Sequence, residues 1–308
     1  VGLGRTGRAV SWMFGMIIVA QIAGVVQANV ASLAAGSEAP SLAILRFSWL
    51  IFMLPHSVVV VSLATAYFTR MSTNARDKNL AGVRADFLSS VSRIGFFMVL
   101  ATAGLVVVSL PFARQFGGEI ETMQAMALVI SLYALGLVAF SVLFIVQRVF
   151  YALEDTKTPF FLQVFQATVF ISLALGVSTL PLSQIAYGLA LSTSTAGTLQ
   201  TAVALIVLRR KLGGLGLMPL GIKFMTYALA ALPASALGVG ILVWFNAGAN
   251  GVLTSSSFVA GLLMALITCA MSATYALFLW LLRNGEFLEM TAGIRSRLRL
   301  GGRGNSST

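Results

Sequence analysis

The stretch Phe258–Leu282, FVAGLLMALITCAMSATYALFLWLL, runs for 25 residues without a charged side chain. A helix needs about 20 apolar residues to cross the hydrocarbon core of a bilayer, where an unpaired backbone group finds no partner. We therefore expect an all-α polytopic membrane protein with eight transmembrane helices. The other seven predicted spans, with approximate boundaries, are Ala9–Ala31, Leu42–Phe68, Ile94–Phe112, Met123–Val146, Phe160–Leu180, Gln184–Leu208 and Phe224–Phe245.

The composition of the whole chain agrees with this class of protein. Of its 308 residues, 58% are hydrophobic and 9% are charged, whereas an ordinary soluble domain has about 25% charged residues. So few charges cannot cover a water-facing surface, which excludes a soluble enzyme. The net charge of +11 would suit nucleic acid only if the basic residues gathered on one soluble face, but they lie between the apolar runs. We therefore expect no nucleic-acid partner.

Two further features limit the chemistry of the chain. Cys269, the only cysteine, lies inside the apolar run quoted above, so neither a disulfide nor a cysteine-based metal site is available. We expect no metal and no cofactor. The chain begins at Val1, and its first apolar stretch is too long for the core of a signal peptide. We therefore expect a fragment or a processed form of a longer protein.

The basic residues are distributed unevenly between the loops. Eighteen of the 20 Lys and Arg residues fall in the amino-terminal segment, in alternate loops and in the tail. Positively charged loops stay on the cytoplasmic side of the membrane. We therefore expect a multi-pass protein of a bacterial inner membrane with both termini in the cytoplasm. The segments that carry these residues are 5–8, 70–93, 148–157, 209–223 and 283–303.

Two segments on the basic side predict a contact with anionic lipids. In the loop Thr69–Arg93, apolar residues recur at helical spacing from Leu80 to Ile94. We interpret them as an amphipathic helix that lies on the membrane surface, with its basic residues near anionic headgroups. The tail, residues 295–308, is basic at first and then rich in Gly, Asn and Ser, which predicts a disordered cytoplasmic segment.

Polar residues interrupt the predicted spans at a few positions. Arg46 either reaches out to the outer headgroups or binds an anion in a central cavity, where a guanidinium suits phosphate oxygens. Pro55 and His56 lie near the middle of the same span, and we expect a hinge or gate there because proline removes a helix hydrogen bond. His56 is either a neutral packed side chain or a proton carrier. Three amides of the first span either join helices or bind substrate in a cavity: Gln21, Gln27 and Asn29.

The groups that catalysis or ion transport would need are missing from the predicted spans. All nine acidic residues map to loops or span ends. A proton or sodium relay through the helices would therefore lack its usual carboxylate. The chain contains no HExxH, GxSxG or P-loop motif and no pair of catalytic carboxylates. We expect no catalytic residues and a membrane protein that is not an enzyme.

The loop after the fourth span carries the most specific motif of the chain. Residues 147–159 read QRVFYALEDTKTP, which resembles the signature R-x-F-Y-A-x-x-D-T-x-T-P of the MurJ/MviN family of lipid II flippases. Residues 54–65, LPHSVVVVSLAT, followed by RMS at 70–72, are similar to the proline-bearing span of that family. The resemblance covers nearly the whole chain and corresponds to the carboxy-terminal half of a typical member, its seventh to fourteenth helices.

This resemblance implies a fold and a function. The fold is that of the multidrug/oligosaccharidyl-lipid/polysaccharide exporter superfamily, in which two six-helix lobes surround a cavity. Residues 1–208 would form one lobe, and residues 209–294 would add the two extra helices of the family. Family members move lipid-linked peptidoglycan precursor from the inner to the outer leaflet by alternating access. The implied partners are this lipid, the missing amino-terminal lobe, and proteins of cell-wall synthesis or division.

The signature loop transfers onto this chain residue by residue. We expect a structural turn in which Asp155 accepts local hydrogen bonds or pairs with a nearby cation, before the next helix opens. The signature positions are occupied by Arg148, Tyr151, Asp155, Lys157, Thr158 and Pro159.

The second span departs from the family pattern. The resemblance implies a cavity arginine and an acidic residue shortly before the proline, but these positions hold Leu50 and Met53. Arg46 lies one turn before Leu50 on the same helix face, so it would replace that arginine only in a cavity that lies further out. Two alternatives therefore stay open: another exporter of the superfamily, for polysaccharide lipids or drugs, and a transport-inactive scaffold that recruits cell-wall enzymes.

Overall fold

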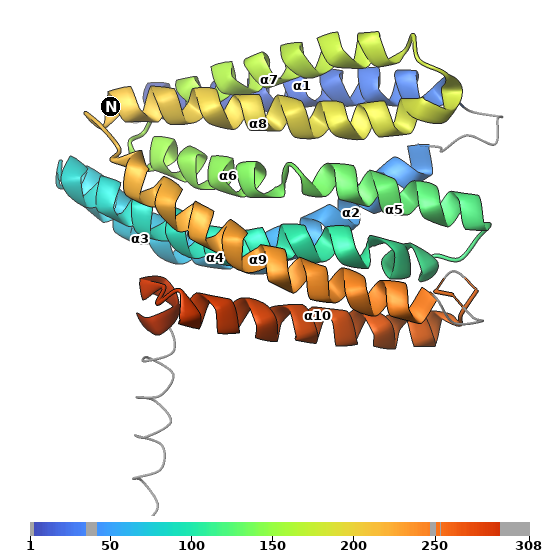
Figure 1. The fold of residues 1–308 in the computed structure, drawn as a ribbon. Coiled ribbons are helices and arrows are strands. Elements are labelled where there is room, and N and C mark those ends of the chain that lie inside the picture. Colours follow the sequence, from blue (N-terminus) through green and yellow to red (C-terminus); the bar gives the residue numbers. More distant parts are fainter. Residues whose placement is uncertain (1–2, 35–41, 247–250, 253, 290–308) are drawn as a thin grey trace, which may run out of the picture.

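The computed structural model describes residues 3–34, 42–246, 251–252 and 254–289, with side chains from residue 7 onward. The regular structure in these ranges is helical, which confirms the expected all-α fold (Figure 1). The predicted basic tail, residues 295–308, lies outside the described ranges. The elements are α1 (Leu3–Ser32), α2 (Leu42–Pro55), the π-helical turn η1 (His56–Val60), α3 (Val61–Arg76), α4 (Leu80–Arg114), α5 (Ile120–Ala134), α6 (Leu137–Ala152), α7 (Lys157–Val177), the 3₁₀ turn η2 (Leu182–Gln184), α8 (Ile185–Lys211), α9 (Leu217–Asn246) and α10 (Ser257–Leu281).

The predicted number of membrane spans agrees with the fold. Seven helical segments in the described ranges are long and apolar enough to cross a bilayer. A further span is divided, because α5 and α6 are bent by 43° at a short break. Counting this pair as one span gives eight. The segments α2, η1 and α3 together form one span, Leu42–Arg76, which contains the predicted interruption at Pro55.

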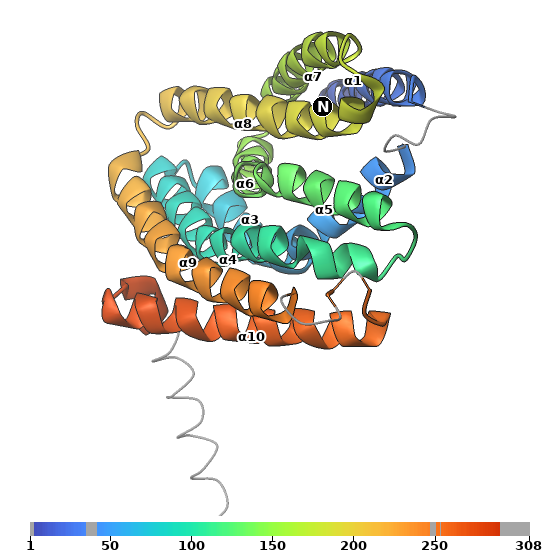
Figure 2. The same cartoon turned by 45° about the vertical axis from the view of Figure 1, so that its right-hand side comes forward.

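The helices pack in a layered arrangement around α2–α6. At one side α1 and α7 pack against α8, and at the other side α9 and α10 pack against α4 (Figures 1 and 2). Buried apolar side chains of α1–α8 form one continuous core. A second core lies between α4 and the pair α9–α10, and it includes Tyr227, Met271 and Tyr275. The two last helices therefore attach to the bundle mainly through α4, while the domain boundary near residue 208 stays a prediction.

The prediction of a separate helix on the membrane surface in the loop Thr69–Arg93 is wrong. After a short turn, α4 runs without a break from Leu80 to Arg114 and includes the next span. Most of the apolar residues that suggested an amphipathic helix are buried against the bundle, as Val83 and Phe87 show, while Leu80 at the start of α4 is exposed. A helical period indicates that one face of a helix is covered, but it does not tell whether lipid or protein covers it.

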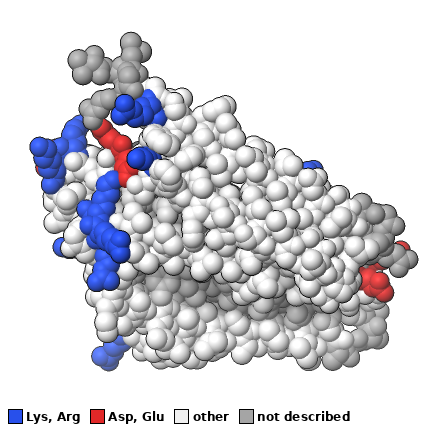
Figure 3. Space-filling model, turned by 90° about the horizontal axis from the view of Figure 1, so that it is seen from above, with Lys and Arg blue, Asp and Glu red and all other residues white. Residues whose placement is uncertain are grey.

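Most of the Lys and Arg side chains gather at one end of the molecule (Figure 3). The turns α3–α4, α6–α7 and α8–α9 lie at this end, together with the start of α1 and the end of α10 (Figure 1). The alternation of charged connections that the sequence predicts is thus present in the fold. We call this end of the molecule the basic end.

Candidate functional site

One face of the span α2–η1–α3 is exposed along its length. In the half away from the basic end, this face carries Arg46 together with the apolar side chains of Phe47, Leu50, Leu54 and Val58. Their spacing of three and four residues places them along one line of the helix. Arg46 is therefore a single cation on an otherwise apolar exposed surface.

The half of this span nearer the basic end is polar instead. Here α3 exposes Ser62, Thr65 and Thr69 on one face, and we call these three residues the α3 hydroxyl face. The hydroxyls of Ser62 and Thr65 donate to the carbonyl oxygens of Val58 at 2.7 Å and Val61 at 2.8 Å. A hydroxyl oxygen that donates still has lone pairs, so each can accept a hydrogen bond from a polar neighbour.

Two arginines flank the α3 hydroxyl face. On the α6 side, the Arg148 guanidinium lies 4.6 Å from the ring centroid of Phe144 and 5.7 Å from that of Phe68. On the α4 side, the Arg70 guanidinium lies 5.6 Å from the ring centroid of Tyr67. Stacking on a ring positions a guanidinium while its N–H groups can still donate. In the described part of the chain, Arg148 has no carboxylate within ion-pair distance.

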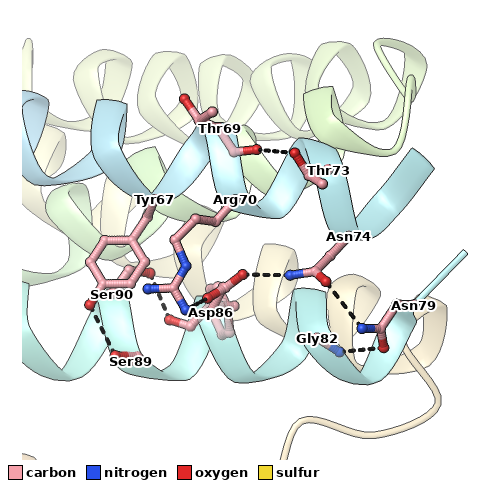
Figure 4. A network of polar contacts seen from close by, with 11 residues as sticks. Tyr67, Thr69, Arg70, Thr73, Asn74, Asn79, Gly82, Asp86, Ser89 and Ser90 are labelled. Atoms are coloured by element: carbon pink, nitrogen blue, oxygen red, sulfur yellow. Dashed lines mark hydrogen bonds and ion pairs between the residues drawn. The ribbon is translucent and has the colours of Figure 1, made fainter. Parts of the chain in front are cut away.

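Asp86 is the centre of a polar network between α3 and α4 (Figure 4). Its carboxylate pairs with Arg70 at 2.7 Å and accepts a hydrogen bond from Asn74 at 2.8 Å. Asn79 donates to Asn74 and also caps α4, because its side chain accepts from the Gly82 N–H at 2.9 Å. The Asp86 side chain is only 4% exposed, so the sequence interpretation missed a buried carboxylate near this site.

A second buried carboxylate, that of Glu286, joins α4 and α9 to the segment after α10. It accepts hydrogen bonds from Ser92 at 2.9 Å and Lys223 at 2.7 Å, and Arg93 lies 3.7 Å away. Burial alone would raise the pKa of Glu286. The contacts with Lys223, Ser92 and Arg93 outweigh burial and hold this pKa below its ordinary value. Glu286 is therefore a charged group that ties the last two helices to the bundle.

The signature loop forms the turn between α6 and α7. The Asp155 carboxylate accepts from the Thr158 N–H at 2.9 Å and from the Thr158 hydroxyl at 2.6 Å, and it pairs with Lys211 of α8. Asp155 thus makes both kinds of contact that its position in the motif predicts. Pro159 is buried in the first turn of α7, where a backbone N–H has no partner within the helix. Burial raises the pKa of Asp155, but the hydrogen bonds from Lys211 and Thr158 dominate and hold it below its ordinary value.

The charge of Asp155 is expected to stabilise this turn at neutral pH and not in acid. Because the pKa of Asp155 is lower in the folded protein than its ordinary 3.8, the stabilisation is complete above that value and is lost as the pH falls through the folded pKa. Asp155→Asn keeps a helix-capping side chain but removes the charge. We expect this variant to lower the free energy of unfolding by about 1 kcal/mol at neutral pH. Thermal unfolding in detergent should show a smaller difference in acid, and an equal difference at both pH values would contradict this account.

The other signature residues lie around the same turn. Tyr151 is half-buried at the end of α6, and Lys157 is exposed at the start of α7. The Lys157 ammonium lies 6.0 Å from the ring centroid of Trp12 and 5.8 Å from that of Phe161. The turn therefore connects α6, α7 and α8 with α1 through Asp155 and Lys157.

The predicted substrate-binding residues are not brought together by the fold. Arg46 is exposed on α2, and Gln21 and Asn29 are exposed on α1. Gln27 donates to the hydroxyl of Tyr133 on α5 at 3.4 Å, which is one of the two roles considered for the amides. A role of these residues in substrate binding stays a prediction. The α3 hydroxyl face was missed, although its hydroxyl residues recur at intervals of three and four in the sequence.

Pro55 and His56 lie where α2 gives way to the π-helical turn η1. The His56 ring is buried, with its centroid 4.7 Å from that of Phe140 and 5.1 Å from that of Phe144, both on α6. Its Nδ1 has no hydrogen-bond partner among the described residues. This apolar environment favours the neutral packed side chain over the proton carrier.

Comparisons with known proteins agree on one family. A family model described as "Lipid II flippase MurJ" matches residues 1–284. A protein of Thermotoga maritima named probable lipid II flippase MurJ is 29% identical over 198 residues, which are 63% of this chain and 39% of that protein. A solved structure of lipid II flippase MurJ in an inward closed conformation has the same fold, with a TM-score of 0.64 at 21% identity. That match covers 87% of this chain and 53% of the solved chain, so the chain spans about half or less of the length of these relatives.

Proposed function

The chain belongs to the lipid II flippase MurJ family, and on this premise we propose that it is part of a flippase for lipid-linked peptidoglycan precursor. The family consists of membrane transporters that serve cell-wall synthesis rather than of catalytic enzymes. In our proposal the precursor moves from the inner to the outer leaflet of a bacterial inner membrane by alternating access. The structural observation that best supports the proposal is the α3 hydroxyl face, which lies between Arg148 and Arg70.

The chemistry of the substrate explains why such a face is needed. A lipid-linked precursor has a diphosphate and a sugar–peptide headgroup, and moving unpaired polar groups into hydrocarbon costs several kcal/mol each. Hydroxyls of Ser62, Thr65 and Thr69 can exchange hydrogen bonds with sugar and peptide groups. The guanidinium of Arg148, positioned by two rings and without a carboxylate partner in the described chain, suits a phosphate oxygen. We assign this half of the path to the headgroup.

The exposed face of α2–η1–α3 also supports the proposal that this chain is one of two lobes. The chain covers 39% of the Thermotoga maritima relative and 53% of the solved chain, so a second lobe of similar size would complete the protein. In our proposal this chain is the carboxy-terminal half, and the other lobe faces the line from Arg46 to Thr69. Arg46, Gln21 and Asn29 would then be available to substrate in the outer half of the path.

We further propose that the basic end lies in the cytoplasm. The connections with Lys and Arg converge there, as the positive-inside rule requires of cytoplasmic loops (Figure 3). Anionic headgroups of the inner leaflet would attract these side chains. The α3 hydroxyl face, which is nearer this end, would then meet a headgroup that enters from the cytoplasmic leaflet.

Depletion of the full-length protein from cells tests the function itself. If the chain is part of the flippase, lipid-linked precursor should accumulate in the inner leaflet while its exposure on the outer leaflet falls. A protein of unrelated function, expressed as a control from the same promoter, should not restore exposure. Outer-leaflet exposure that is unchanged by depletion would remove the flippase proposal.

The double variant Thr65→Leu/Thr69→Leu should impair transport in the full-length protein. Loss of two hydrogen bonds of about 0.7 kcal/mol each would reduce the rate about tenfold. Because both side chains are exposed, the melting temperature should change little. Thr168→Leu is the matched control, since Thr168 is also exposed and also donates to the carbonyl four residues earlier, at 2.9 Å, but lies on α7. Equal losses in both variants would show that the effect is not specific to the α3 hydroxyl face.

The two buried carboxylates of the described chain argue against an ion-driven drug antiporter of the same superfamily. Such an antiporter needs a carboxylate inside a span that can bind and release a cation. Asp86 and Glu286 both lie near the basic end and already pair with Arg or Lys side chains. The flippase is therefore the function that the arrangement supports best.

A further inference from the structure

Two neighbouring spans of the bundle are both broken part of the way across. The first span changes from α2 to α3 through Pro55 and the π-helical turn η1. The second changes from α5 to α6 at Leu135 and Gly136, with a bend of 43°. Sharp bends occur where a proline, a π-helical turn or an inserted group interrupts the ladder of helix hydrogen bonds.

The two breaks lie against each other. The His56 ring at the first break packs on Phe140, just after the second break, with ring centroids 4.7 Å apart. On the other side of the breaks, Trp49 of α2 packs on Tyr133 of α5 at 5.5 Å. α2 contacts α5, and α3 contacts α6. We call α2 with α5, which lie away from the basic end, the outer pair, and α3 with α6, which lie nearer the basic end, the inner pair. The two pairs meet at the level of the two breaks.

α8 runs unbroken past the second break and bonds to it on both sides. The Ser194 hydroxyl donates to the carbonyl of Leu132 at 2.7 Å, in the last turn of α5. The Thr201 hydroxyl donates to the carbonyl of Ala139 at 3.0 Å, in the first turn of α6. A Cβ atom on Gly136 would lie 3.0 Å from Ser194 Oγ and 3.1 Å from Ser194 Cα, so a side chain at the break would require α8 to move by a few tenths of an ångström. α8 therefore acts as a continuous support for both halves.

Hydrogen bonding and packing are both incomplete at the two breaks. Pro55 has no N–H, and the Ser57 hydroxyl donates to the carbonyls of Met53 at 2.8 Å and Leu54 at 3.1 Å. The first break therefore lacks one of the backbone hydrogen bonds that would hold α2 straight against α3. A cavity of about 30 Å³, large enough for a water molecule, lies between α2, α5, α6 and α8 and is bordered by Phe52, Gly136 and Ser194, so the packing at the second break is incomplete.

We propose that this lobe bends internally at the two paired breaks, so that the outer pair α2–α5 tilts on α8 relative to the inner pair α3–α6. This inference rests on the proposed function, because the bend would open and close the outer half of the substrate path beside Arg46. α5 has 15 residues and is thus about 22 Å long, so a tilt of about 10° moves its far end by about 4 Å. Such a displacement changes the width of the path without rotating the whole lobe.

Distances between spin labels in the full-length protein test the bend directly. Labels would replace the exposed Glu121 at the start of α5 and Gln184 just before α8, after Cys269→Ala removes the native thiol. We expect this distance to shift by about 4 Å between the protein with lipid II and the protein without it. The control pair, exposed Thr168 on α7 and Thr195 on α8, should keep its distance, because neither helix is broken. A shift of equal size in both pairs would overturn the proposal.

Two variants add a functional readout to the distances. Gly136→Ala puts a Cβ atom against α8. Pro55→Ala restores a backbone N–H at the first break, without adding an atom against a neighbouring helix. We expect either to suppress the shift and to slow transport about tenfold while the binding of lipid II is unchanged. A protein that transports lipid II without any shift overturns the bend alone. A protein that bends on adding lipid II but does not transport it overturns the proposed function instead.

Discussion

Glu286→Ala should loosen the attachment of α9 and α10 to the rest of the bundle. The carboxylate accepts hydrogen bonds from Ser92 and Lys223, and its side chain is only 10% exposed. Its removal leaves two cations, Lys223 and Arg93, without their common anion, although water reaches both because each is about two-fifths exposed. We expect the free energy of unfolding to fall by about 2 kcal/mol, less than for a fully buried pair.

Thermal unfolding in detergent measures this effect, and limited proteolysis locates it. Glu289→Ala is the matched control, since Glu289 is an exposed acid three residues further along the same segment. The control should change stability by less than about 0.5 kcal/mol. Cleavage between α8 and α9 should become faster in Glu286→Ala but not in the control. If the two variants melt alike, the carboxylate of Glu286 does not hold these helices.

Asp86→Ala should have the second large effect, on the hairpin between α3 and α4. The carboxylate pairs with Arg70 and accepts from Asn74, and its side chain is 4% exposed. Arg70 is 67% exposed and can be hydrated after the change, so the main loss is the pair of charge-assisted hydrogen bonds. We expect the free energy of unfolding to fall by about 2 kcal/mol.

The same hairpin supplies the control for this variant. Asp77 lies in the turn before α4, is 63% exposed, and is 3.9 Å from Arg76. An exposed ion pair of this kind contributes about 0–1 kcal/mol, so Asp77→Ala should leave the melting temperature nearly unchanged. Both variants remove one negative charge from the basic end, which keeps the change in net charge equal. A loss of stability in Asp77→Ala as large as in Asp86→Ala would show that net charge, and not the buried network, is responsible.

The sequence was sufficient to predict the class of fold and the number of spans, because lipid imposes length and polarity on every helix. It was also sufficient for the hydrogen bonds that Asp155 accepts from Thr158, since these residues are near in sequence, but it did not identify Lys211 as the cation that pairs with Asp155. It did not predict the break at Gly136. At that break Ser194 supplies a hydroxyl to the carbonyls of Leu132 and Tyr133, which lie 62 and 61 residues earlier in the chain.

Burial of charged residues was the main feature that the sequence could not reveal. The sequence placed Asp86 and Glu286 in loops or at span ends. Their positions in the sequence do not show which cations surround them in the fold. The sequence showed a helical period from Leu80 onward. It did not show that the apolar face of this helix packs against protein rather than lipid. Arg46 and Gln21, for which substrate binding was one of two predicted roles, are exposed in the described lobe. Their role depends on what faces α1 and α2 in the whole protein.

The most direct test of the central claim is the accessibility of the α3 hydroxyl face to water. Single cysteines at Thr65 and Thr69 would be introduced into the full-length protein carrying Cys269→Ala, with Thr168→Cys on α7 as the comparison. If this face lines the path of the headgroup, a membrane-impermeant thiol reagent added on the cytoplasmic side should label positions 65 and 69, lipid II should slow the labelling, and position 168 should stay unlabelled. Protection of positions 65 and 69 to the same degree as position 168 would place the face in lipid and contradict the account.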